Sequence, residues 1–245
     1  YLDMANMKHF PPLTKLKAIC ILIVLGLLVY INVFNNGFIW DDDGQIVNNV
    51  MIHSLENLGM LFTGSTFGFS ASGQLSGAYY RPLMSTFFAI IYTIFGSNPF
   101  FFHLFQILFH IGNAILVFLF LGYFFSISLS LALAAIFLVH PINSETVGYI
   151  ASTGDVLFLF FGMMAISMLR KKLTPILSAT FSGLLLLWSL FSKETGFLFL
   201  PIIFLWKWFY YRKNIVTLIL TSCGVITIYL LYRFGLAHIY FDRPD

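Results

Sequence analysis

The polar residues that could do chemistry gather in a few short segments of an otherwise apolar chain. The most concentrated segment contains three successive carboxylates, Asp41, Asp42 and Asp43, directly after Phe38-Ile39-Trp40. Adjacent carboxylates repel one another, so holding them at a low-dielectric boundary requires a cation, a proton or a compensating base. We interpret the segment as the start of a site, and a solvated acidic cap is the alternative.

A second group of residues is suited to bind a phosphate. Arg81 stands in Tyr79-Tyr80-Arg81-Pro82-Leu83, and a guanidinium matches phosphate oxygens with two hydrogen bonds while keeping its charge when partly dehydrated. Lys193 and Glu194 form a charged pair between two apolar runs, and Arg233 follows the last run. We expect the three cations to contact a lipid phosphate, with Glu194 in support; headgroup anchoring and a local ion pair are the alternatives.

Two further segments add polar groups. His103, Gln106, His110 and Asn113 are spaced three, four and three residues apart, which places them on one helical face. We expect His110 and Asn113 to bond neighbouring helices and keep His103 as a candidate binding residue. Two histidines seven residues apart on a helix are separated by about 10 Å, too far to share a metal.

The connection between the third and fourth apolar runs contributes His140, Glu145 and Asp155. These residues could complete the site that the aspartates begin, so we assign them, with Asp43, a supporting role. For Asp155 the alternative is a charge that complements the dipole of the following helix.

Composition defines the elements that must position these residues. The 245 residues are 59% hydrophobic and only 9% charged, against roughly 25% charged residues in soluble domains. We therefore expect an all-α integral membrane protein, and no basic run with interleaved aromatics indicates nucleic acid. A helix crosses a bilayer with about 20 residues. Seven runs approach this length: 17–34, 100–121, 124–139, 153–169, 174–191, 195–211 and 215–232.

The topology depends on an eighth run, 82–96, which is shorter and begins with a proline. If it lies along the membrane within an external loop, 35–99, and the N-terminus is cytoplasmic, nine of the thirteen basic residues fall on the cytoplasmic side. If it spans, two basic clusters move outside. We therefore predict seven spans, an interfacial helix and an external C-terminus. Nine of the ten acidic residues then lie outside, which suggests an external polar site.

Five motifs occur in the order known from one family. The sequence resembles the GT-C superfamily of membrane glycosyltransferases, closest to the protein O-mannosyltransferase-like branch with C-terminal tetratricopeptide repeats. The resemblance implies one seven-helix module over 1–245, and we expect a further C-terminal part of the parent protein beyond it. The motifs are FIWDDD (38–43), YYRPL (79–83), NPFFFHLFQILFHIGNA (98–114), HPINSETVGYIASTGD (140–155) and SKETG (192–196).

The resemblance also implies an activity: inverting transfer of a mannose-like sugar from a polyprenyl-phosphate carrier to a protein Ser or Thr hydroxyl, on the external or luminal face. The acidic pair of the family falls on Asp41 and Asp42, of which one would take the acceptor proton. Thr153 departs from an arginine that related sequences often have. The superfamily contains enzymes with and without a required Mg²⁺ or Mn²⁺, and we expect no required metal, although Asp41, Asp42 and Asp43 would be its ligands. A lipid or glycan acceptor, a transporter and a catalytically dead scaffold are the alternatives.

Overall fold

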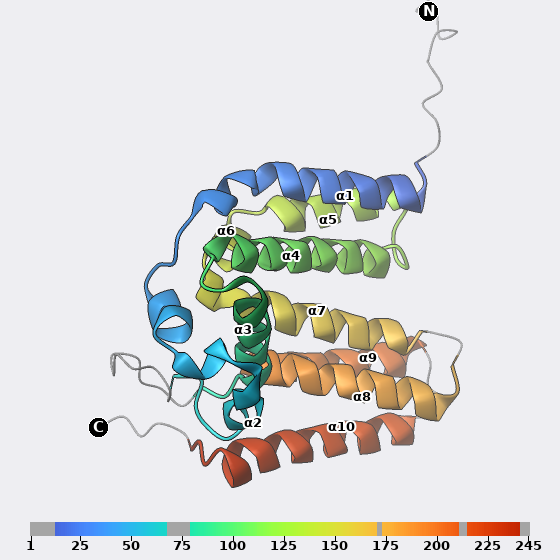
Figure 1. Cartoon of the computed structure of the whole chain (residues 1–245). Coiled ribbons are helices and arrows are strands. Elements are labelled where there is room, and N and C mark those ends of the chain that lie inside the picture. The colour runs from blue at the N-terminus through green and yellow to red at the C-terminus, as the bar shows by residue number, and fades with distance from the viewer. Residues whose placement is uncertain (1–12, 68–78, 171–172, 211–214, 241–245) are drawn as a thin grey trace, which may run out of the picture.

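The computed structural model describes residues 13–67, 79–170, 173–210 and 215–240, and all regular structure within these residues is helical. Each predicted apolar run forms a helix, and Figure 1 shows the long helices side by side. They are α1 (Lys15–Val29), α4 (Pro99–Leu121), α5 (Ile127–Val139), α7 (Thr153–Met168), α8 (Pro175–Ser192), α9 (Phe199–Tyr210) and α10 (Ile215–Leu230).

The lengths of these helices only partly match the predicted spans. Four described helices are long and apolar enough to cross a bilayer, and α5 together with the short helix α6 (Ile142–Gly148), bent by 61°, forms a fifth candidate. By contrast, α1 has 15 residues and α9 has 12. The all-helical membrane fold is therefore confirmed, and the structure supports four or five of the spans by length and composition. The four are Pro99–Leu121, Ile150–Met168, Pro175–Ser192 and Ile215–Leu236.

Four of the described long helices begin at a residue whose side chain caps the first turn. Thr14, Asn98, Ser126 and Thr174 each accept a hydrogen bond from a backbone N–H in the first turn of the helix that follows. In α4 and α8 the first helical residue is a proline, which has no N–H to leave unpaired. These short signals fix the turns that bring the helices back alongside one another.

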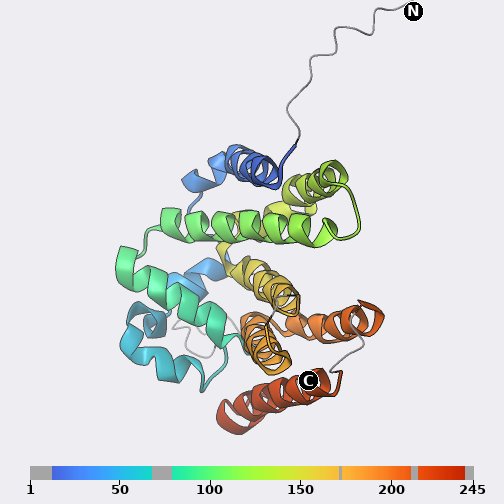
Figure 2. The same ribbon diagram turned by 90° about the vertical axis from the view of Figure 1, so that its right-hand side faces the viewer.

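The segment between α1 and α4 lies at one end of the long helices. It contains a π-helical turn (Asp43–Val47), three 3-10 turns (Ile31–Asn35, Val50–His53 and Leu55–Asn57), the short helix α2 (Leu58–Leu61) and α3 (Pro82–Phe95). Figures 1 and 2 show α3 running across the direction of α4 at that end. The predicted short apolar helix near 82–96 is therefore confirmed as a helix separate from the long ones, and its position along the membrane surface stays a prediction.

Charges in the described residues separate between the two ends of the helices. All described acidic residues lie in the segments at the end where α3 lies, together with three basic residues. The other end, where α1 and α8 begin and α7 and α9 finish, is basic. The acidic residues are Asp41, Asp42, Asp43, Glu56, Glu145, Asp155 and Glu194, and the basic residues of the opposite end are Lys15, Lys17, Arg170 and Lys207.

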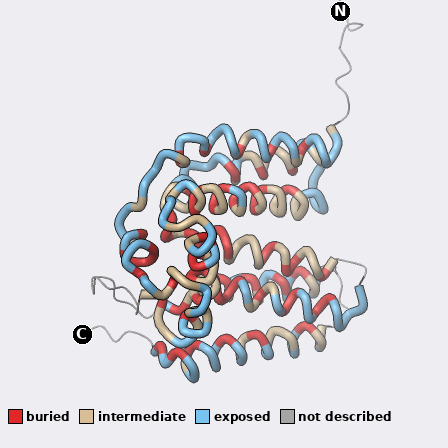
Figure 3. Tube along the Cα trace, viewed as in Figure 1, coloured by how far each residue is buried: buried red, intermediate tan, exposed pale blue. Residues whose placement is uncertain are grey.

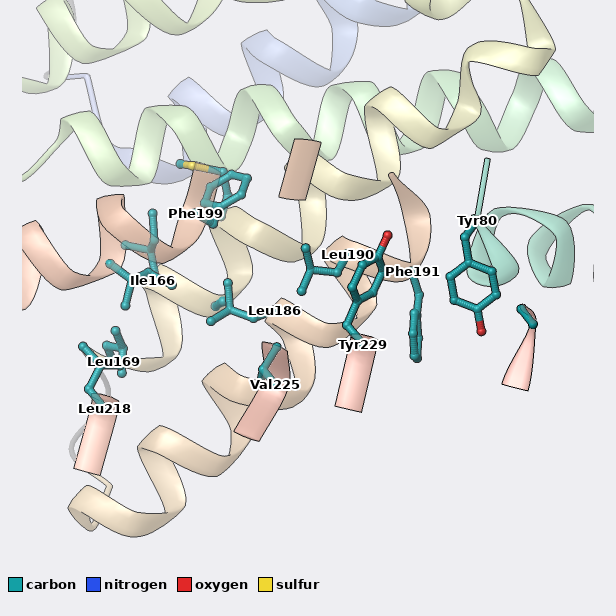
Figure 4. Close-up of a cluster of buried hydrophobic side chains, with 14 of the residues drawn as sticks. Tyr80, Ile166, Leu169, Leu186, Leu190, Phe191, Phe199, Leu218, Val225 and Tyr229 are labelled. Carbon is teal, nitrogen blue, oxygen red and sulfur yellow. The ribbon is translucent and has the colours of Figure 1, made fainter. Parts of the chain in front are cut away.

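The largest group of buried apolar side chains joins α7, α8, α9 and α10. Figure 4 shows it running from Leu169 and Leu218 to Phe191, Tyr229 and Tyr80. A second group packs α1 against α4 and α5. Exposed residues, many of them large and apolar, line the outward sides of α1 and α10 (Figure 3), as expected for surfaces that face lipid.

Polar side chains of α4 bond the backbone of neighbouring segments. His110 Nε2 donates to the carbonyl of Leu138 at 3.0 Å, and Asn113 Nδ2 donates to the carbonyl of Val156 at 2.9 Å. Leu138 lies in the last turn of α5, where carbonyls lose their helical partners. The predicted helix-bonding role of His110 and Asn113 is confirmed.

Close packing of α7 against α9 gives a first testable prediction. A Cβ atom on Gly162 would lie between 2.1 and 2.4 Å from three ring atoms of Phe199, whereas a Cβ atom on Gly224 in α10 meets nothing within 4 Å. We expect Gly162→Ala to lower the unfolding free energy by about 1–3 kcal/mol, because the Phe199 ring must move. Gly224→Ala should be neutral or stabilising.

Thermal unfolding in detergent, with both variants beside the wild type, measures this difference. Equal midpoints for the two variants would show that α7 and α9 do not pack in this way.

Candidate active site

Asp42 connects two distant segments at the acidic end. Its Oδ2 accepts the Ile39 N–H at 3.0 Å, and its Oδ1 accepts the Ala151 N–H at 2.7 Å. The residue is fully buried. Burial raises the pKa of Asp42 to about 6, although the two amide donors act in the opposite direction. Asp42 therefore has a structural role: its buried carboxyl group links the segment of Ile39 to the segment of Ala151.

Asp41 has a different environment because the chain turns sharply just before it. Trp40 has a φ of 49°, in the left-handed region that bulky residues rarely adopt. Asp42 is buried, whereas Asp41 is half-buried and lines a pocket. The Asp41 N–H donates to the Tyr149 hydroxyl at 3.2 Å, and burial raises the pKa of Tyr149 above its ordinary value. Tyr149 is therefore a neutral phenol beside Asp41.

The pocket has a volume of about 400 Å³ and combines acidic and basic groups. Asp41 and Tyr149 come from the loop after α1 and the turn before α7. Arg81 precedes α3, Asp155 lies in the first turn of α7, and Lys193 follows α8. The side chains that the argument uses are Asp41, Gln45, Arg81, Tyr149, Asp155 and Lys193.

Glu194 holds two arginines at the side of this pocket. Its Oε2 lies 3.2 Å from Arg81 Nε, and its Oε1 lies 3.3 Å from Arg233 Nη1. The Tyr80 N–H also donates to Oε1, at 3.1 Å. Burial alone would raise the pKa of Glu194, but Arg81 and the amide donors outweigh it and hold the pKa below its ordinary value. Glu194 is therefore an anion that orients Arg81.

Lys193 forms the second ion pair. Its Nζ lies 2.6 and 2.7 Å from the two carboxylate oxygens of Asp155. Asp155 lies in the first turn of α7 and also lines the pocket. Its charge can therefore complement the dipole of α7 and support the site at the same time. Thr153 is buried and donates to the carbonyl of Ile150 at 2.7 Å.

The other predicted site residues lie outside the pocket lining. Arg233 is buried behind Glu194, where Nη1 also donates to the Tyr229 hydroxyl at 3.0 Å. His103 is fully buried in α4, whereas Asp43, His140 and Glu145 are exposed. Within the described ranges, no group of three or more His, Cys, Asp or Glu side chains converges as metal ligands.

Tyr149 and Gln45 are among the pocket residues that were not predicted from the sequence. Tyr149 stands inside the motif 140–155, but an isolated tyrosine near a membrane boundary is common and gave no signal of its own. Gln45 follows the acidic run and lines the pocket while it is almost fully buried. Both residues could have been identified from their positions, because Tyr149 lies within the motif 140–155 and Gln45 lies two residues after the motif 38–43.

Comparison with known proteins finds similarity to one group of enzymes. The chain is 29% identical over 194 residues to a protein O-mannosyl-transferase of Caenorhabditis elegans, an alignment that covers 76% of this chain and 27% of the relative. It is 28% identical to human protein O-mannosyl-transferase TMTC3, covering 64% of this chain and 17% of the relative. For human TMTC1 the identity is 32%, covering 65% and 20%.

The resemblance inferred from the motifs is thereby confirmed. The chain spans about a quarter or less of the length of these relatives. No family model matches the chain, and no solved structure matches it significantly.

The burial of Asp42 predicts a pH-dependent stability. Folded Asp42 holds its proton up to about pH 6, against 3.8 as its ordinary value, so the unfolding free energy should fall as the pH rises between these values. The difference corresponds to roughly 3 kcal/mol. Reversible unfolding in SDS across this pH range should show the decline for the wild type and for Asp43→Asn, whose carboxylate is exposed. A decline of equal size in Asp42→Asn would contradict the assignment.

The Glu194 ion pairs predict a second effect on stability. Glu194→Gln keeps the size of the side chain but leaves two partly buried arginines without their counter-charge, so we expect a loss of about 1–3 kcal/mol at neutral pH. Because the pKa of Glu194 is lowered, the stabilisation is present at neutral pH and is lost as the pH falls through the folded pKa. Thermal unfolding measures the loss, with the exposed Glu145→Gln as the control. Similar midpoints for the two variants would refute it.

Proposed function

We propose that this chain is the membrane module of a glycosyltransferase that moves a mannose-like sugar, with inversion, from a polyprenyl-phosphate carrier to a Ser or Thr hydroxyl of a protein. The observation that supports it best is a single pocket that is lined by Asp41 together with Arg81 and Lys193. The names of the relatives, protein O-mannosyl-transferases, support the sugar and the protein acceptor.

Asp41 is the base in this proposal. Its carboxylate takes the proton of the acceptor hydroxyl while the hydroxyl oxygen forms a bond to the anomeric carbon of the sugar. The bond from that carbon to the phosphate oxygen breaks, and the phosphate leaves with the electron pair. Asp42 is less suited to this role, because both of its oxygens already accept backbone N–H groups. The neutral Tyr149 hydroxyl helps to orient Asp41 through its backbone amide.

Arg81 and Lys193 are the cations that meet the departing phosphate. Charge that develops on a leaving group is stabilised best by groups already fixed in place, because no reorganisation is then needed during the reaction. Glu194 and Asp155 hold these two cations in place. Arg233 does not contact the phosphate in this proposal; it helps to hold Glu194 in place through their ion pair.

The proposed membrane arrangement has seven spans, with the acidic end external or luminal and the N-terminus cytoplasmic. Support comes from Lys15, Lys17, Arg170 and Lys207, which all lie at the opposite end, since cytoplasmic loops are enriched in basic residues. The two short helices approach the required length when their flanking 3-10 turns are added. These turns are Ile31–Asn35 after α1 and Glu194–Leu198 before α9.

A transfer assay with the full-length protein tests this function. Radiolabelled polyprenyl-phosphate sugars are incubated with membranes, and label is counted in protein and lipid fractions, with and without EDTA. We expect label in protein, and a loss of about 10²- to 10⁴-fold in Asp41→Asn, because a positioned base contributes by that factor. Asp43→Asn is the matched control, since it removes the neighbouring exposed carboxylate.

Each outcome separates the alternatives. Label in lipid that depends on Asp41 would change the acceptor but keep the donor and the base. Equal transfer by Asp41→Asn and Asp43→Asn would refute Asp41 as the base. No transfer from any donor by a folded protein would favour a transporter or a scaffold without activity.

A further inference from the structure

A second pocket lies at the opposite, basic end of the helices. Its volume is about 420 Å³, and its lining comes from the ends of four helices: the start of α1, the end of α4, the start of α5 and the end of α7. Lys15 is the first residue of α1, and Arg170 follows α7 by two residues. The argument uses Lys15, Phe118, Leu119, Tyr123, Ile127 and Arg170.

The lining combines cations with an apolar wall. Arg170 lies over the ring of Tyr123, which fixes its guanidinium at the pocket. Lys15 adds a second charge from another helix. Phe118, Leu119 and Ile127 supply an apolar surface beside them. A soluble anion would use only the cations, whereas a lipid would use both parts.

The position of the pocket also favours a lipid over a soluble anion. The ends of apolar helices lie at the level of lipid headgroups, because the helices match the hydrocarbon thickness. All described carboxylates lie at the other end of the protein, so the electrostatic potential at this end favours anions. Basic pockets between membrane helices are suited to lipid phosphates in this way.

We propose that the pocket between the ends of α1, α4, α5 and α7 binds the phosphate of an anionic lipid through Lys15 and Arg170, with the lipid chain along Phe118, Leu119 and Ile127. Its ligand is a lipid phosphate, carried either by a phospholipid or by a polyprenyl monophosphate. This site is distinct from the pocket around Asp41 and does not depend on the proposed sugar transfer.

Native mass spectrometry of the full chain tests the proposal. The protein is released from nanodiscs of phosphatidylcholine that contain either phosphatidylglycerol or a polyprenyl monophosphate, and the retained lipid is counted. We expect retention of at least one anionic lipid over phosphatidylcholine. Lys15→Gln should reduce it about fivefold, and Lys15→Gln with Arg170→Gln roughly thirtyfold, since a basic residue that contacts the phosphate of an anionic lipid contributes a factor of about five.

Two controls keep the result interpretable. Lys17→Gln removes the same charge from the same helix, two residues from Lys15, at a residue outside the pocket lining. It should leave retention unchanged. If the double variant does not fold, the single variant Lys15→Gln still tests the proposal, because Lys15 is exposed and its replacement should not disturb folding.

The two lipids identify the source of the phosphate. Retention of phosphatidylglycerol that depends on Lys15 shows a phospholipid site, and retention of the polyprenyl monophosphate alone shows a carrier site. Anionic lipid retained equally by the wild type and Lys15→Gln would overturn the proposal, as would an equal loss in Lys17→Gln.

Discussion

One buried carboxylate determines the arrangement of the acidic end. Asp42 binds the amides of Ile39 and Ala151, which lie 112 positions apart, so the loop after α1 cannot move independently of the turn before α7. The same turn is held from the other side by Gln106 of α4, which donates to the carbonyls of Thr146 and Tyr149. With the turn fixed at both sides, Tyr149 is held against Asp41, and the pocket keeps its shape.

The environment explains why so much of the polar chemistry serves the backbone. At the end of an apolar bundle, irregular backbone has little water to bond, so its amides and carbonyls need partners from the protein. The carbonyl of Leu138, at the end of α5, accepts hydrogen bonds from the Tyr30 hydroxyl and from His110 Nε2. Polar residues on a membrane helix are often interpreted as part of a binding or catalytic site. On α4, three of the four polar residues of the stripe instead hold neighbouring segments together.

The sequence predicted the elements better than the contacts between them. The apolar runs, the short helix near 82–96 and the resemblance could all be derived, because hydropathy and motif order are local properties. Which of Asp41 and Asp42 faces the pocket could not be derived, because the left-handed turn at Trp40 and the amide of Ala151 decide it. The sharing of Glu194 between two arginines that are 152 residues apart was equally invisible. The span lengths were overestimated for α1 and α9, where 3-10 turns replace α-helix.

The two ion pairs of the pocket differ in a way that bears on how a phosphate would bind. Both cations already have carboxylate partners, so an arriving phosphate must compete with Asp155 and Glu194. Arg81 and Arg233 are 14% and 10% exposed, and removing the counter-charge of such buried cations is costly. Lys193 and Asp155 are 26% and 30% exposed, so water can replace either partner at lower cost. Lys193 is therefore the cation better able to exchange its partner, while Arg81 keeps a fixed orientation.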